Sequence, residues 1–159
     1  LDMMLYFSDE FVKVSSFISN SFWNHNVEDN AYTIMKSKSG IVGMLHSTAT
    51  EWRHKFRLEI TLEKAQLELS GILSGSKSYG EEKLITTVKK NEKSKKIPNE
   101  KVKKYRKDES WAREVNEFAH CIINDKDIKS GSSIDALNVM KLIDKIYKAD
   151  KSWKKKYNL

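Results

Sequence analysis

The sequence predicts an α+β fold, in which a mainly antiparallel β-sheet has helices packed on one face and leaves its other face available. Two observations support this prediction. Short alternating runs follow one another from residue 31 to residue 70 with brief connections between them, and such connections make neighbouring strands antiparallel. Two amphipathic helical stretches then close the chain, and they need an apolar surface to cover.

Period-two alternation identifies the strands. The clearest run is 55–63, where Phe56, Leu58, Ile60 and Leu62 alternate with charged or polar residues, so one face of that strand should be buried. Further strands are expected at 11–23, 31–38, 41–50, 66–70 and, at an edge, 83–88. In the first of these the alternation places Val12, Val14, Ser16, Ile18 and Phe22 on one side.

Two helices are expected after the sheet. The first begins at Asp108 or Ser110, ends near Asn124, and carries an apolar stripe at spacings of three and four, made of Trp111, Val115, Phe118, Ala119 and Ile122. The second begins at a capping box formed by Ser132 and Asp135. Its expected buried stripe is Ala136, Val139, Met140, Ile143, Ile146 and Tyr147.

Composition bounds the class of protein. With 159 residues, 39% hydrophobic and 32% charged, the chain is expected to form one folded domain, 1–159. It has no apolar run of membrane-spanning length. The single cysteine, Cys121, fits a reducing compartment, so a cytoplasmic location is expected. Because the chain starts at Leu1 as if midway through a helix, we expect it to be a fragment of a longer protein.

The positive charge belongs to one segment. Residues 89–107 hold nine lysines and one arginine against two glutamates, a net +8 in a chain of +7. A nucleic-acid surface should interleave aromatic residues with basic ones, and Tyr105 is the only aromatic here. A solvated loop is therefore favoured, because blocks of like charge repel one another. Binding of a polyanion by this segment stays open as an alternative.

Familiar catalytic motifs are absent from the sequence, and the four histidines and one cysteine have no metal-ligand spacing, so no metal is expected. Two places suit a ligand. Trp23, Asn24 and His25 combine an aromatic ring with amide and imidazole groups, which suits a sugar-like molecule, although they also suit a simple polar turn. A second cluster of Arg53, His54 and Lys55 suits a carboxylate or phosphate, or an exposed strand junction.

Three stretches together resemble a known family. They are VEDNAYTIMKSKSGIVGMLHSTATEW (27–52), SWAREVNEFAHCII (110–123) and GSSIDALNVMKLIDKIY (131–147). Their order and spacing resemble the C-terminal domain of the glucose–fructose oxidoreductase / inositol dehydrogenase / MocA (Gfo/Idh/MocA) family. The resemblance implies that the parent protein is an NAD- or NADP-dependent dehydrogenase whose N-terminal Rossmann domain holds the cofactor.

The resemblance also locates what this chain would lack. Leu1–Leu5 looks like the segment just after the family's proton-relay histidine, with Asp2 at the family's H-x-x-D position. The catalytic lysine and histidine would then precede the chain. No catalytic residue and no bound cofactor are expected in it, and the chain is expected to be inactive alone.

On this reading the chain is the substrate-side and oligomerisation domain of an oxidoreductase acting on the CH–OH group of a sugar, sugar nucleotide or cyclitol. Its expected partners are the missing Rossmann domain, a sugar-like substrate, and further copies in a homodimer or tetramer formed through the sheet face. Neither a membrane nor nucleic acid is an expected partner. The alternative is a non-enzymatic module that contacts nucleic acid or another polyanion through residues 89–107.

Overall fold

The computed structural model describes residues 1–88 and 97–159, and the chain divides into two compact units. Unit 1 contains residues 1–50 and 121–159, and unit 2 contains residues 51–120. Each unit has a β-sheet of its own, and the single domain over 1–159 stays a prediction. No helix in the described part of the chain has the length and hydropathy of a membrane span.

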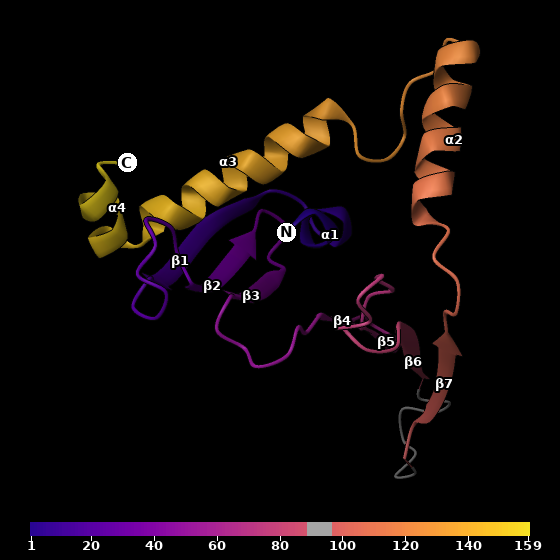
Figure 1. The fold of residues 1–159 in the computed structure, drawn as a ribbon, viewed down its shortest axis with the longest axis horizontal. Helices are drawn as coiled ribbons and strands as arrows, with labels where there is room; N and C mark the ends of the chain where they lie inside the picture. Colours follow the sequence, from indigo (N-terminus) through magenta and orange to yellow (C-terminus); the bar gives the residue numbers. More distant parts are fainter. Residues whose placement is uncertain (89–96) are drawn as a thin grey trace. The chain divides into compact units, whose positions relative to one another are not determined.

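Unit 1 is a three-stranded antiparallel sheet with helices on one side (Figure 1). The strand order is β1-β2-β3. The elements of the unit are α1 (Asp2–Phe7), β1 (Phe11–Ser19), β2 (Asn30–Ser37), β3 (Val42–Thr48), α3 (Ser133–Ala149) and α4 (Lys151–Tyr157). The α+β fold class is therefore confirmed.

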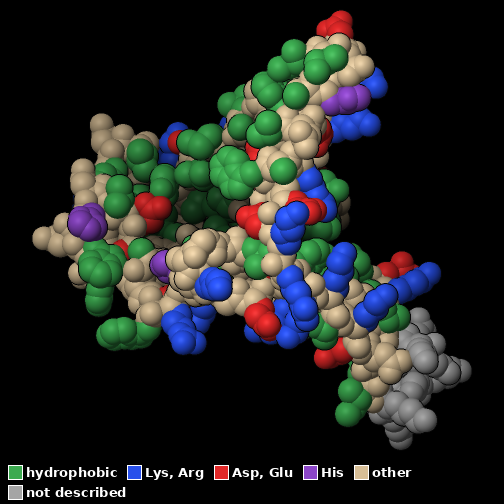
Figure 2. Space-filling model, turned by 45° about the vertical axis from the view of Figure 1, so that its right-hand side comes forward, with side chains coloured by type: hydrophobic (Ala, Val, Ile, Leu, Met, Phe, Trp, Pro, Cys, Tyr) green, Lys and Arg blue, Asp and Glu red, His purple; other side chains and the backbone are tan. Residues whose placement is uncertain are grey.

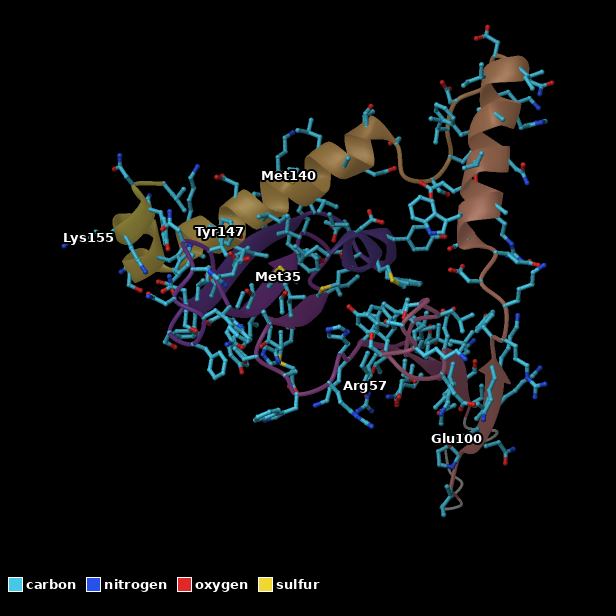
Figure 3. All side chains as sticks on the ribbon, in the orientation of Figure 1. Met35, Arg57, Glu100, Met140, Tyr147 and Lys155 are labelled. Atoms are coloured by element: carbon cyan, nitrogen blue, oxygen red, sulfur yellow. The ribbon has the colours of Figure 1, made fainter. Side chains whose placement is uncertain are left out.

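The core of unit 1 lies between α3 and the sheet. Phe11, Met35, Leu142 and Ile146 form one buried cluster, with Met35 in the sheet that α3 crosses (Figure 3). The Ser16 hydroxyl donates to the Ile146 carbonyl at 2.6 Å. Since that carbonyl belongs to the helix, this bond joins α3 directly to β1.

Two details of this packing differ from the sequence prediction. A register shift between Phe11 and Lys13 turns Phe11 into the core and leaves Val12 47% exposed, because a bulge reverses the alternation of a strand. In α3 the buried residues include Leu142, while Met140 is 60% exposed. The predicted Ile146 is buried, but periodicity alone did not identify Leu142, because this helix has apolar residues on several sides.

Large apolar side chains occupy the opposite face of the sheet of unit 1. The cross-strand pairing places these side chains next to one another, and we call this side of the sheet the open face. Its exposed apolar side chains are Phe17, Tyr32, Ile34, Val42 and Met44. The rings of Tyr32 and His46 stack there at 4.0 Å. The face left uncovered by α3 is thus more apolar than an ordinary wet sheet surface.

Unit 2 contains a second antiparallel sheet, of order β4-β5-β6-β7. Its strands are β4 (Arg57–Thr61), β5 (Ala65–Ser70), β6 (Lys83–Val88) and β7 (Asn99–Lys104). Most of α2 (Ser110–Ile123) also belongs to it, and the last three residues of that helix belong to unit 1. The single continuous sheet inferred from the sequence is therefore wrong, because β3 and β4 do not pair. Eight residues separate these strands, too many for the tight hairpin that would hold them together.

The basic segment is a strand over part of its length. Residues 89–96 lie outside the described residues, but Asn99–Lys104 pairs with β6 as β7, where the sequence predicted one loop over 89–107. Pairing requires only backbone groups, and exposed lysines suit an edge strand because they discourage the addition of another chain. Lys104 also forms an ion pair with Glu81 at 3.0 Å.

No described residue of unit 2 is buried. One face of its sheet is apolar, with Leu58, Leu69 and Leu84 in register, but these side chains are only half-buried. The expected apolar stripe on α2 exists, yet its large members are exposed, and Figure 2 shows hydrophobic side chains along this helix. Burial of apolar side chains is therefore concentrated in unit 1.

The buried cluster predicts a contrast between two leucines of α3. Leu142 is 3% exposed and Leu137 is 52% exposed. Leu142→Ala should lower the free energy of unfolding by about 2–5 kcal/mol, because it leaves a cavity. Leu137→Ala should change it by roughly 0.5 kcal/mol or less. Urea unfolding followed by tryptophan fluorescence, to which buried Trp153 contributes, measures both, and similar losses in the two variants would contradict this core.

Candidate functional site

A cavity of about 700 Å³ lies in unit 1, beside α1 and the N-terminal half of α3. We call it the α1–α3 cavity. Its apolar lining comes from Met3, Leu5, Tyr6, Phe11 and Leu142, and its polar lining comes from Asp2, Asp9, Glu10, Lys129, Ser130, Gly131, Asp135, Asn138, Lys141 and Lys145. A volume of this size, with mixed lining, is typical of small-molecule sites.

Helical spacing explains why α3 lines this cavity. Asp135, Asn138, Lys141 and Lys145 recur at intervals of three and four residues, which places them along one side of the helix. The helix begins at the predicted capping box, in which the Ser132 hydroxyl accepts from the Asp135 backbone N–H at 3.2 Å. This cap fixes where the row of polar side chains starts.

Three carboxylates of the cavity are already bonded. Asp9 accepts from the backbone N–H and hydroxyl of Ser39 at 2.9 and 3.0 Å. Glu10 pairs with Lys145 and with Lys38, each at 2.7 Å. The bond from Lys145, followed by that from Lys38, lowers the pKa of Glu10 to about 2. These acids are therefore ionised and engaged at neutral pH.

The third engaged carboxylate is that of Asp135. It accepts from the Ser132 hydroxyl and backbone N–H, each at 2.8 Å, and these bonds lower its pKa. By contrast, the side chains of Lys129 and Lys141 have no hydrogen-bond or ion-pair partner within the described part of the chain. Two ammonium groups of the cavity thus remain available to a ligand.

The first predicted ligand site is a turn organised by a buried aspartate. Trp23, Asn24 and His25 follow β1 in unit 1 and stay near one another, and the Trp23 indole N–H donates to the Ala49 carbonyl at 2.9 Å. Asp29 is 4% exposed and accepts from the backbone N–H groups of Phe22 at 2.6 Å and Trp23 at 3.3 Å. None of the three predicted residues lines the α1–α3 cavity.

The electrostatics of this turn follow from its hydrogen bonds. Burial alone would raise the pKa of Asp29, but bonds from the Phe22 backbone, the Asn30 and Ser19 side chains and the Trp23 backbone together lower it below its usual 3.8. The carboxylate therefore supports the loop as an anion. A ligand role for Trp23, Asn24 and His25 stays a prediction.

The second predicted site belongs to unit 2. Lys55 pairs with Glu51 at 2.7 Å, and His54 Nδ1 is 2.7 Å from the Ser78 hydroxyl. The ring of Tyr79 lies 5.0 Å from that of His54. The sequence placed Arg53, His54 and Lys55 together as cations, yet two of them already have partners within the unit. Their binding role also stays a prediction.

The sequence analysis missed the residues of the α1–α3 cavity. They come from two stretches, 2–11 and 129–145, separated by more than a hundred positions, and no local motif joins them. The available signal was the capping box at Ser132 followed by polar residues at helical spacing, which marks a polar side on an otherwise apolar helix.

Neither a metal nor a dinucleotide fits these described residues. Among them no three His, Cys, Asp or Glu side chains group closely enough to hold a metal ion. All paired strands are antiparallel, whereas a Rossmann dinucleotide site opens between parallel strands and helix N-termini.

Comparison with known proteins identifies the first part of the chain. A family model of the GFO/IDH/MocA C-terminal domain matches residues 1–68, so the resemblance stated above is confirmed. No curated protein sequence matches the chain.

Several solved oxidoreductases have a similar fold. For the UDP-N-acetylglucosamine 3-dehydrogenase GnnA of Acidithiobacillus ferrooxidans the TM-score is 0.74 at 15% identity, over 96% of this chain and 46% of that one. For a protein described as an NADPH-dependent oxidoreductase of Desulfitobacterium hafniense the TM-score is 0.67 at 16% identity, over 86% of this chain and 39% of that one. For a protein described as an oxidoreductase of Yersinia pestis the TM-score is 0.66 at 13% identity, over 95% of this chain and 45% of that one. The chain spans less than half the length of each.

The Asp29 bonds predict a pH-dependent loss of stability. Because the folded pKa lies below 3.8, the stabilisation from Asp29 is fully present above that pH and is lost as pH falls through the folded pKa. Asp29→Asn should lower the urea midpoint at pH 7, and the difference from the natural chain should shrink below about pH 3.8. Exposed Asp127→Asn is the control. A difference independent of pH would contradict the role of the charge.

Proposed function

We propose that this chain, built as a Gfo/Idh/MocA-type C-terminal domain, forms the substrate side of an NAD(P)-dependent oxidoreductase acting on a CH–OH group of a sugar, sugar nucleotide or cyclitol. The observation that carries the proposal is the family match over residues 1–68. The fold shared with several oxidoreductases supports it.

The reaction divides between two domains. Oxidation of the carbinol transfers a hydride from carbon to the nicotinamide ring, and the hydroxyl proton passes to a general base. In this proposal both the cofactor and that base belong to a companion Rossmann domain. The present chain binds and orients the substrate and excludes water from one side of it.

We place the substrate at the α1–α3 cavity. Asp2 lines it, and the resemblance puts Asp2 three positions after the proton-relay histidine of the family. Asn138 adds hydrogen-bonding groups for hydroxyls, while Tyr6 and Leu5 add apolar surface. Such a combination suits a polyhydroxylated ring, which has polar edges and apolar faces.

We also propose that the open face of the sheet of unit 1 pairs with a second copy of the chain. Its exposed apolar side chains include Phe17, Ile34 and Met44, and a contiguous apolar patch is typical of an interaction surface. A twofold interface brings the same surface of two copies together, so one face serves both partners.

Ligand titration tests the substrate site. We expect UDP-N-acetylglucosamine, the substrate named for the GnnA dehydrogenase, to shift the backbone NMR signals of residues 2–11 and 129–145 in the isolated chain. NADH should leave those signals unchanged, because the dinucleotide site lies in another domain. Shifts confined to the surroundings of Trp23 or Arg53, or shifts from NADH alone, would contradict the assignment.

Association can be tested with two matched methionines. Met44 lies on the open face and is 78% exposed, and Met140 lies on α3 and is 60% exposed. Met44→Asp should abolish dimers in light scattering coupled to gel filtration, because it buries a charge in an apolar interface. Met140→Asp should leave the mass unchanged. A natural chain that is monomeric at high concentration would refute this interface.

A further inference from the structure

We propose that Lys129 and Lys141 bind a phosphoryl group of the substrate in the α1–α3 cavity, so that the parent enzyme acts on a phosphorylated or nucleotide-linked sugar rather than on a free sugar or cyclitol. This inference rests on the proposed function and narrows its substrate class. It follows from which charged side chains of the cavity already have a bonded partner and which do not.

The charges of the cavity separate into two groups. Asp9, Glu10 and Asp135 are bonded to protein donors, and Lys145 is bonded to Glu10. The charges left without a bonded partner among the described residues are the ammonium groups of Lys129 and Lys141 and the carboxylate of Asp2. These three leave a surplus of one positive charge, although the whole lining carries four acids and three lysines.

The two free lysines come from different elements. Lys129 belongs to the segment before α3, and Lys141 is in the third turn of that helix. Both line the same cavity. Lysine binds phosphate as a mobile point charge with three donors, so two such side chains from separate elements can contact different oxygens of one phosphoryl group.

The size of the cavity favours the same class of substrate. Small-molecule sites span roughly 300–1,000 Å³, and this cavity holds about 700 Å³. That volume has room for a substrate larger than a single sugar ring. A ring held by Asp2, Asn138 and the apolar side of α1 would leave space for an attached phosphate beside the lysines.

The test compares a neutral sugar with its phosphorylated and nucleotide-linked forms and with phosphate alone. The chain is titrated by NMR with N-acetylglucosamine, its 1-phosphate, its UDP conjugate and inorganic phosphate. We expect both phosphorylated sugars to bind at least about tenfold more tightly than the neutral sugar. A stronger response to the UDP conjugate identifies a nucleotide sugar, and an equal response to both identifies a sugar phosphate.

Two double variants separate specific from general electrostatics. Lys129→Gln with Lys141→Gln should abolish the preference for phosphorylated ligands while leaving the weak binding of the neutral sugar. Lys101→Gln with Lys103→Gln removes the same charge from β7 in unit 2 and should change neither affinity. Equal losses in the two variants would assign the effect to the net charge of the chain and overturn the proposal.

The outcomes also separate this inference from the proposed function. If neutral and phosphorylated sugars shift the cavity signals with equal affinity in all variants, the lysines have no such role, but the cavity remains the substrate site. If no ligand shifts the signals of residues 2–11 and 129–145, the cavity is not the substrate site and both proposals fail.

Discussion

The carboxylate of Asp150 fixes the position of α3 on β1, and the rest of unit 1 depends on that position. Asp150 is 8% exposed, and its carboxylate accepts from the Ile18 backbone N–H in β1 at 2.8 Å. It also caps α4 by accepting from the backbone N–H groups of Ser152 and Trp153, each at 2.9 Å. Burial would raise the pKa of Asp150, but these bonds together lower it, so the anion is kept.

This one anion joins a strand, the end of one helix and the start of another. Asp150 fixes the C-terminal end of α3 on β1, and the bond from Ser16 to Ile146 fixes the helix again one turn earlier. Together these two contacts set the register of α3 across the sheet. The opposite end of α3 then meets α1, and the cavity forms there. The geometry of the candidate site is therefore set by contacts at the far end of the same helix.

The same region is anchored through its polar loops. The Tyr147 hydroxyl donates to Glu28 at 2.8 Å, and burial, followed by this bond, raises the pKa of Tyr147 to about 12. Asn20 donates to the Tyr157 hydroxyl of α4. The turn that carries Trp23 is thus held between the sheet, α3 and α4.

Local rules predicted the fold better than the site. The alternation in β4 and β5 and the Ser132–Asp135 capping box are short-range patterns, and the structure has both. The bulge beside Phe11 and the division into two sheets depend on packing between distant segments, which alternation does not encode. For the same reason the sequence highlighted the conspicuous run at Arg53, His54 and Lys55, and missed Lys129 and Lys141, which only the fold brings to one cavity.

The absence of buried side chains among the described residues of unit 2 has a consequence for motion. A segment that opens locally must break its contacts, and the energy required grows with the apolar surface that it buries. The four strands of unit 2 hold one another mainly through backbone hydrogen bonds. Their amide protons should therefore exchange with solvent well before those of β1 and α3, so this part of the molecule gains full rigidity only when something covers its apolar face.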